Sequence, residues 1–207
     1  MRLKFVSMVC CAAAMFMSTS CVNDNDNSSK TMTPDEVNYC FRTVRGDYTG
    51  DLIYVAQNVK DVNDKTDTLK ISWSISNDST LKIHNFPAKL LADNISDEKL
   101  KAALAEADNQ DIVCRIGFVN TQPVQFLINP VAPSFTINFE GADHKIQPAF
   151  YVNTANSFGS YTSTKSELYM QIIEGAIFMD GKQTTYLSQA NPFAFEGKTS
   201  SSTISEQ

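Results

Sequence analysis

Hydrophobic and polar residues alternate along most of the chain after residue 65, which is the pattern of half-buried β-strands. In "ISWSIS", Ile71, Trp73 and Ile75 alternate with three serines. The same period of two recurs in "LKI", "DIVCRIGFV" and "SFTINFE". The positions predicted to face the core are Ile71, Trp73, Ile75, Leu81, Ile83, Ile112, Cys114, Ile116, Phe118, Phe135, Ile137 and Phe139.

Short polar or glycine-containing segments separate these runs and predict hairpin turns at residues 120–122, 141–143 and 180–181. The run "ELYMQIIEGAIFM" is long for one strand, so Gly175 is a candidate bulge or bend inside it. We count eight or nine strands, mostly sequential and antiparallel. The pattern therefore predicts a mainly β fold, an antiparallel meander that forms a barrel or a sandwich, with an N-terminal helix and one inserted helix.

The N-terminal helix begins with the capping box Thr33-Pro34-Asp35-Glu36 and is expected to end at Gly46. Its apolar residues recur at helical spacing on one face, at Val37, Cys40, Phe41 and Val44. The inserted helix is predicted over residues 97–107, with Ser96 as its cap. Its inward positions are Leu100, Ala103, Leu104 and Ala107.

The first twenty residues have the composition of a secretory signal peptide. A basic start at Arg2 and Lys4 precedes an apolar run at residues 5–17 and three small residues at 18–20. Thirteen apolar residues are too few to span a bilayer, which needs ~20. The alternative, a buried N-terminal helix, does not explain the basic start or the small residues.

The segment Ser18-Thr19-Ser20-Cys21 resembles the lipobox of bacterial lipoproteins, in which the signal peptide is cut before the cysteine and the thiol is diacylated. The resemblance implies that Cys21 is the lipidated first residue of the mature chain. At ~0.8 kcal/mol per buried CH₂, two or three acyl chains hold a protein firmly on a membrane. The alternative is ordinary cleavage, which leaves Cys21 as a thiol.

Residues 21–32 then read as a flexible tether, because almost none of them is apolar. Calcium binding by Asp24 and Asp26 is the alternative, but a disordered tail does not pre-organise the six to eight oxygens that calcium takes. Acidic residues after a lipidated cysteine also resemble export signals of Bacteroidota lipoproteins. We therefore expect a lipoprotein of the cell envelope, held in the outer membrane on its periplasmic face or at the cell surface.

Under this interpretation Cys10 and Cys11 leave with the signal peptide, and Cys40 and Cys114 remain. In an oxidising compartment they could form a disulfide. Two buried thiols explain the pattern as well, since both residues lie on apolar faces.

The composition is that of a folded domain: 43% of the residues are hydrophobic and 19% are charged. We assign residues 33–197 to a single β-rich domain and residues 198–207 to a disordered polar tail. With 17 Lys and Arg against 23 Asp and Glu, the net charge is −6. Nucleic acid is therefore not an expected partner, because its phosphates require a basic surface.

The chain carries few residues with catalytic or metal-binding potential. His84 and His144 have no partners at ligand spacing, and the loop at residues 61–67 lacks the glycine of a calcium-binding EF-hand. Glu140, Asp143 and Glu174 could form a glycosidase pair only if the fold brings them together. We predict no metal, no cofactor and no enzymatic activity; a hydrolase is kept as an alternative.

The tripeptides Asp67-Thr68-Leu69 and Asp78-Ser79-Thr80 resemble acceptor sites of Bacteroidota periplasmic O-glycosylation. Both lie in predicted loops, where a modifying enzyme could reach Thr68 and Ser79. A plain turn is the simpler interpretation of each.

The segment "VRGDYTGDLIYV" resembles the start of calycin-like, or lipocalin-like, lipoproteins of Bacteroidales, in which a Gly-x-Tyr-x-Gly turn joins a helix to the first strand. Here the motif is Gly46-x-Tyr48-x-Gly50, where Tyr48 can close one end of a barrel and Gly50 permits tight strand bending. The resemblance implies an uncharacterised domain-of-unknown-function lipoprotein family and lends no activity.

Two functions remain open. The first is a non-catalytic binding module for a small apolar ligand or a glycan, whose cavity the 13 Phe and 7 Tyr could line. The second is a structural or assembly lipoprotein that contacts a partner protein in the envelope. An enclosed apolar cavity favours the first, and a solid core with an exposed apolar patch favours the second.

Overall fold

The computed structural model describes residues 31–56 and 65–200 of the chain. In these residues it contains eleven β-strands and three helices. The strands are β1 (Gly46–Val55), β2 (Thr66–Asn77), β3 (Thr80–Phe86), β4 (Gln110–Thr121), β5 (Val124–Pro130), β6 (Phe135–Phe139), β7 (Ala142–Phe150), β8 (Phe158–Thr162), β9 (Glu167–Met179), β10 (Lys182–Gln183) and β11 (Asn191–Thr199). The helices are α2 (Pro34–Val44), α3 (Ala88–Leu91) and α4 (Glu98–Ala105).

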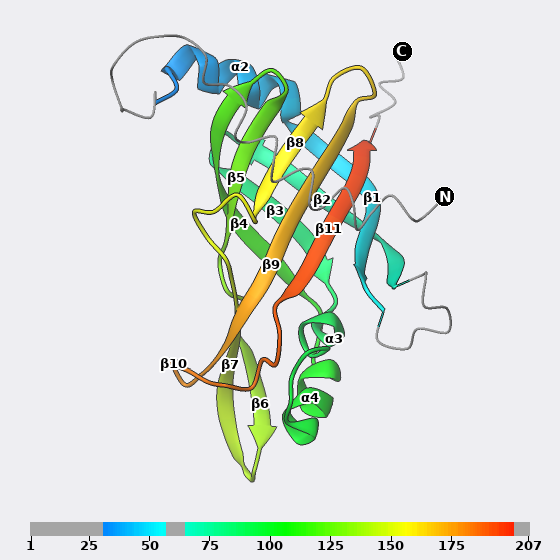
Figure 1. Cartoon of the computed structure of the whole chain (residues 1–207), viewed down its shortest axis with the longest axis vertical. Helices are drawn as coiled ribbons and strands as arrows, with labels where there is room; N and C mark the ends of the chain where they lie inside the picture. Colours follow the sequence, from blue (N-terminus) through cyan, green and yellow to red (C-terminus); the bar gives the residue numbers. More distant parts are fainter. Residues whose placement is uncertain (1–30, 57–64, 201–207) are drawn as a thin grey trace, which may run out of the picture.

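Eight of the strands close into an antiparallel barrel (Figure 1). They are hydrogen-bonded in the order β11-β1-β2-β3-β4-β5-β8-β9, and β9 pairs with β11 to complete the circle. This arrangement confirms the predicted mainly β fold and decides between its two forms in favour of the barrel.

The remaining strands extend one side of the barrel beyond its end. Strand β9 is thirteen residues long; its first part pairs with β8 and β11, and its last part pairs with β7. The register with β7 skips Gly175, so the predicted bulge is confirmed. The hairpin of β6 and β7 projects below the barrel in Figure 1, beside α4.

Large aromatic side chains fill the barrel interior. The period-two alternation is confirmed, because the residues predicted to face the core are 9% exposed or less. An eight-stranded barrel is about wide enough inside for its own side chains. The fully buried aromatic residues are Tyr48, Trp73, Phe86, Phe126, Phe193 and Phe195.

Helix α2 packs against β4 and β5 at one end of the barrel, and its capping box is confirmed. The Thr33 hydroxyl accepts a hydrogen bond from the Glu36 amide, and the Glu36 carboxylate accepts one from the Thr33 amide at 2.7 Å. The helix ends at Val44, with Arg45 as its C-cap. Gly46 then begins β1 with a φ of +137°, a value that favours glycine.

Two helices, rather than the predicted one, lie near the opposite end of the barrel. Helix α3, which the sequence pattern did not predict, is four residues long and buries Ala88, Leu90 and Leu91. The predicted cap of α4 was wrong by one residue. The carboxylate of Asp97 accepts hydrogen bonds from the amides of Lys99 and Leu100, whereas the Ser96 hydroxyl donates to the Tyr186 carbonyl.

The expected signal peptide, Cys21, residues 22–30 of the tether and residues 201–207 of the tail lie outside the described residues, as do Asp24, Asp26 and most of the 61–67 loop. Strand β11 continues to Thr199, so Lys198 and Thr199 belong to the barrel and not to the tail. Among the described helices, none is long and apolar enough to cross a membrane.

Candidate ligand-binding groove

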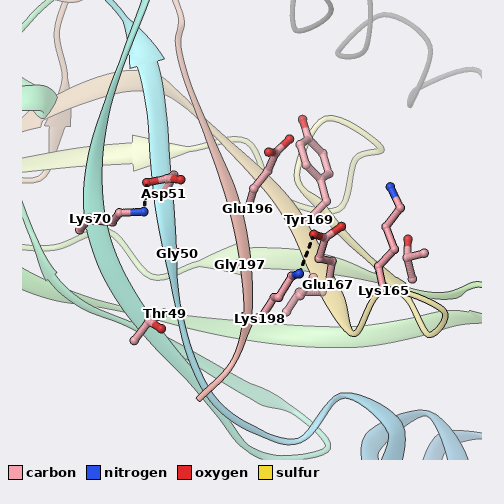
Figure 2. Close-up of a pocket in the computed structure, with 12 residues that line it drawn as sticks. Thr49, Gly50, Asp51, Lys70, Lys165, Glu167, Tyr169, Glu196, Gly197 and Lys198 are labelled. Atoms are coloured by element: carbon pink, nitrogen blue, oxygen red, sulfur yellow. Dashed lines mark ion pairs between the residues drawn. The ribbon is translucent and has the colours of Figure 1, made fainter. Parts of the chain in front are cut away.

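The outer wall of the barrel carries a groove of about 510 Å³ over strands β1, β2, β9 and β11, the end of β8 and the turn before β9 (Figure 2). Its lining consists mainly of charged and hydroxyl side chains around two glycines. The residues that line it are Thr49, Gly50, Asp51, Lys70, Thr162, Lys165, Glu167, Leu168, Tyr169, Glu196, Gly197 and Lys198. The volume lies within the range of ~300–1,000 Å³ that is usual for small-ligand sites.

Strand register brings these side chains together from distant parts of the sequence. Asp51 on β1 lies opposite Lys70 on β2 and opposite Glu196 on β11. Glu196 in turn lies opposite Tyr169 on β9. Because directly opposite residues share a face of the sheet, these four side chains form one row across the outer wall.

A second row lies one step along the strands. Thr49 on β1 is opposite Lys198 on β11, which is opposite Glu167 on β9. Between the two rows, Gly50 pairs with Gly197. A Cβ atom on Gly197 would lie 2.5 Å from the Trp73 ring and 2.6 Å from the Thr49 carbonyl oxygen, so no larger residue fits there. Both glycines occupy inward-facing positions of their strands, and Gly197 leaves room for the Trp73 ring beneath the wall.

Two ion pairs hold four of the charged side chains (Figure 2). Lys70 Nζ lies 2.8 Å from Asp51 Oδ1, and Lys198 Nζ lies 3.4 Å from Glu167 Oε1. Exposed pairs of this kind contribute little to stability, typically ~0–1 kcal/mol. They place ammonium donors and carboxylate acceptors side by side along the groove.

Glu196 differs from the other two carboxylates of the groove. It takes part in none of the ion pairs found among the described residues. Partial desolvation by the groove walls raises its pKa, and the negative charges of Glu167 and Asp51 raise it further. Its carboxyl group is therefore easier to protonate than an ordinary surface glutamate.

Tyr169 forms the aromatic side of the groove. Its ring packs against Phe158 with the ring centroids 5.8 Å apart. Its hydroxyl is shielded from solvent and has no hydrogen-bond partner among the described residues. Burial raises the pKa of Tyr169 to about 12, with a further contribution from Glu196. The phenol is therefore a neutral donor at physiological pH.

The charges of the groove balance. Three carboxylates, on Asp51, Glu167 and Glu196, face three ammonium groups, on Lys70, Lys165 and Lys198. A site with equal numbers of positive and negative groups does not favour ligands of either charge. It does offer many hydrogen-bond donors and acceptors within a short distance. A ligand hydroxyl, which both donates and accepts, can be bonded by either kind of group.

A family model described as "Domain of unknown function (DUF4840)" matches residues 43–179 of this chain. The chain belongs to the DUF4840 family. The match runs from the end of α2 to the end of β9, and β11, which closes the barrel, follows it. Comparisons with curated proteins and with solved structures found no significant match.

In this DUF4840 chain the three acidic residues considered as candidates for a glycosidase pair do not form one site. Glu140 lies in the β6–β7 turn, and Asp143 accepts a hydrogen bond from Asn138 within the same hairpin. Glu174 is fully buried and lies opposite Phe150. Asp143 is seven residues along β7 from Phe150, roughly 23 Å at ~3.3 Å per residue.

Neither histidine of the DUF4840 domain lines the groove. His84 is partly exposed and forms a 3.1 Å hydrogen bond with the Ser74 hydroxyl, so it is not as isolated as the sequence suggested. His144 Nδ1 lies 2.7 Å from Asp180 Oδ2 at the β9–β10 turn. Within the described residues, no group of three potential metal ligands occurs.

Both cysteines of the described domain are buried free thiols, so the structure does not join them. Cys40 Sγ donates to the Asn120 carbonyl at 3.6 Å, and Cys114 lies inside the barrel wall. Burial raises the pKa of both thiols, and Glu36 adds to this effect at Cys40.

The two expected glycosylation residues lie in different environments. Ser79 lies exposed in the turn between β2 and β3, as the sequence predicted. Its amide and its hydroxyl both donate to Asn77 Oδ1, at 2.9 Å each. Thr68 lies within β2, opposite Ile53, so its prediction as a loop residue was wrong; its side chain is nevertheless exposed.

Sequence reasoning named none of the groove residues except the motif glycine Gly50. The alternation places Asp51, Lys70, Tyr169 and Glu196 on the outer face of their strands, and this signal was readable. Which outward side chains are neighbours depends on strand register. Strand β1 pairs with β11, which lies at the other end of the domain, so no hairpin turn indicates their register in the sequence.

Proposed function

We propose that this DUF4840 protein is a lipid-anchored module of the cell envelope that binds an uncharged glycan in the outer-wall groove. The observation that carries the proposal is the groove itself, whose lining holds three carboxylates and three ammonium groups beside a tyrosine on β9. In this proposal the residues that line the groove bind the glycan and have no catalytic role.

The chemistry of the lining favours a polyhydroxyl ligand over a charged or apolar one. A phosphorylated ligand would meet Glu196 and Glu167 at close range, and a cationic ligand would meet the lysines. A neutral sugar ring offers a hydroxyl to each of these groups, and hydrogen bonds to charged partners are the stronger kind, worth about 1.5–3 kcal/mol.

A small apolar ligand inside the barrel is less well supported. The interior positions are occupied by fully buried aromatic and aliphatic side chains, among them Trp73, Phe126 and Phe195. The ring of Phe126 also occupies the space beside Gly159, where any side chain would collide with it. The groove therefore replaces the barrel interior as the candidate site.

The location in this proposal rests on the N-terminal sequence. The Ser18-Thr19-Ser20-Cys21 segment supports an outer-membrane lipoprotein attached through Cys21, with the barrel at the periplasmic face or at the cell surface. The resemblance of the Gly46-x-Tyr48-x-Gly50 segment to lipoproteins of Bacteroidales supports a source in that group. An anchored domain with a lateral groove can meet envelope glycans without leaving the membrane.

The experiment is a screen of the purified full chain in detergent against an array of neutral and charged oligosaccharides, followed by calorimetry on the bound glycans. Lys70→Met, which removes one ion pair of the groove, should weaken binding at least about tenfold. The matched control is Lys82→Met, because Lys82 forms a similar outer-wall pair with Asp111 at 2.7 Å, outside the groove lining.

Three results would contradict the proposal: no glycan bound, only anionic glycans bound, or an equal loss in both lysine variants. Mass spectrometry of the glycan after incubation adds a separate readout. An unchanged mass is expected, whereas a cleaved product would favour the hydrolase alternative.

The second candidate, an assembly lipoprotein, is favoured by exposed apolar side chains on the opposite part of the wall. Val113 and Val131 are 43% and 52% exposed, and the Val131 amide donates to the Val113 carbonyl at 2.8 Å, so they lie side by side. Val152 is 44% exposed. Photocrosslinking from position 131 in intact cells tests this candidate, and a specific adduct with one envelope protein is the expected result.

A further inference from the structure

We propose that the outer edge of β6 binds an extended peptide that carries a basic side chain, in the groove between β6 and α4. The site lies at the end of the molecule where the β6–β7 hairpin projects beside α4 (Figure 1). The proposal concerns a protein partner and is independent of glycan binding in the outer-wall groove.

Strand β6 ends the sheet. It pairs with β7 along its whole length, and no other strand among residues 31–56 and 65–200 pairs with it. An edge of this kind presents unpaired amide and carbonyl groups to which another chain can add as a further strand.

The β6–β7 turn identifies which backbone groups are available. Glu140 and Gly141 have φ values of +53° and +87°, as in a type I′ turn, so the flanking pair Phe139–Ala142 exchanges hydrogen bonds. Hydrogen-bonded pairs alternate in an antiparallel ladder. The amide and carbonyl groups of Ile137 therefore face β7, and those of Thr136 and Asn138 face away from it.

A groove of about 460 Å³ runs along this edge. Four consecutive residues of β6, 135–138, form one wall, and the flank of α4 with the turn after it forms the other. Ala103 and Ala107 lie on the helical side, and their small side chains leave space for those of a bound peptide. Five residues of strand span ~17 Å, which fits four or five residues of an extended partner.

The buried face of β6 fixes the width of this groove. Phe135, Ile137 and Phe139 are each 5% exposed or less, and α4 packs against the strand. The site is therefore preformed, and a peptide that binds there does not have to order the strand first.

The charges along the groove select a basic partner. Glu106 and Asp108 line its helical side, and no lysine or arginine does. Helix α4 also ends at this point, with Glu106 as its C-cap, so its terminal carbonyl groups add negative potential. A lysine or arginine of the peptide would face the two carboxylates and the carbonyl groups at the end of α4.

A second copy of the chain is a poorer occupant than a peptide. Its own β6 carries an α4 beside the same edge, so pairing two such edges would bring both helices into one groove. A single extended segment has no such helix.

The test uses backbone amide hydrogen exchange, followed by NMR on the purified full chain. The probes are six synthetic valine–threonine hexapeptides, each with lysine at a different position, and the same six with glutamate. In the free protein the amides of Thr136 and Asn138 should exchange rapidly, and that of Ile137 slowly. At least one lysine peptide should slow exchange at Thr136 and Asn138 at least tenfold, and the glutamate peptides should not.

Charge variants test the recognition without altering the backbone. The double variant Glu106→Gln/Asp108→Asn should weaken binding of the selected lysine peptide about tenfold, whereas Glu98→Gln, at the exposed start of α4, should not. Thr136→Pro, which removes one outward amide, should abolish the protection. The proposal is overturned if lysine and glutamate peptides bind equally, if no peptide gives protection, or if Thr136 and Asn138 are already protected in the free monomer or in a dimer.

Discussion

The hydroxyl group of Tyr48 donates a 2.6 Å hydrogen bond to the carbonyl oxygen of Val44 and so joins the first barrel strand to the last turn of α2. Both residues are fully buried. The ring of Tyr48 also lies parallel to that of Trp73, with the centroids 5.7 Å apart and an interplanar angle of 6°. One side chain therefore connects the terminal helix, the barrel wall and the core.

Tyr48→Phe should lower the free energy of unfolding by about 1–2 kcal/mol. The change removes a buried hydrogen bond and leaves the Val44 carbonyl without that donor, while the stacking on Trp73 is kept. Urea denaturation followed by the fluorescence of Trp73, the single tryptophan of the chain, measures the change.

The matched control is Tyr39→Phe on the same helix, where the side chain is half exposed. Its free energy of unfolding should change by less than about 0.5 kcal/mol. Equal effects of the two variants would show that the hydrogen bond to Val44 does not stabilise the fold.

Gly197→Ala should destabilise the barrel by about 1–3 kcal/mol or more, because the new methyl group would lie 2.5 Å from the Trp73 ring. Gly117→Ala is the control, since nothing lies within 4 Å of the corresponding position on the exposed face of β4. Thermal denaturation of both variants, with near-ultraviolet circular dichroism as a measure of packing around Trp73, distinguishes the two. A Gly197→Ala variant as stable as Gly117→Ala would contradict the close packing of Gly197 against Trp73.

The features that the sequence predicted correctly are those set by local chemistry. The alternation in "ISWSIS" placed Trp73 in the core, and the capping box placed the start of α2. The resemblance of the Gly46-x-Tyr48-x-Gly50 motif to calycin-like lipoproteins implied that Tyr48 closes one end of a barrel, and Tyr48 is buried against the end of α2. Each of these features depends on residues that lie close together in the sequence.

The features that could not be predicted from the sequence depend on contacts between distant segments. The four-residue α3 is too short to show a helical period, and its apolar run reads equally well as strand. The row of Lys70, Asp51, Glu196 and Tyr169 joins four strands, and it includes the pairing of β1 with β11, which no hairpin turn connects. The candidate groove could therefore be located only in the folded barrel.

Glu174 makes the stability of the protein depend on pH. It is fully buried; one carboxyl oxygen accepts a 3.5 Å hydrogen bond from Asn191, and the other has no partner among the described residues. Burial raises its pKa well above the ordinary value of 4.5, Asp93 raises it further, and Asn191 opposes the shift. The carboxyl group of Glu174 therefore binds its proton more tightly in the folded state than in the unfolded state.

The contribution of Glu174 to the free energy of unfolding should be fully present below about pH 4.5. It should decrease as the pH rises through the pKa that Glu174 has in the folded state. Each pKa unit of elevation corresponds to about 1.4 kcal/mol. In Glu174→Gln the decrease in the free energy of unfolding between pH 4.5 and 8 should be smaller than in the wild type. Denaturation over this range, with the exposed Glu140→Gln as control, measures it. The assignment fails if wild type and Glu174→Gln share one pH profile.

Cys21 should carry the acyl chains that hold the protein on the membrane. In cells labelled with radioactive palmitate, the wild-type chain should incorporate label and sediment with the membrane fraction, because two or three long acyl chains anchor a protein stably in a bilayer. Cys21→Ala should lose both properties. Cys11→Ala is the matched control, since residue 11 lies in the segment proposed to be removed, and it should label like the wild type. Equal labelling of Cys21→Ala and wild type would refute the anchor while leaving the glycan proposal open, because the groove lies in the barrel wall and not in the N-terminal segment.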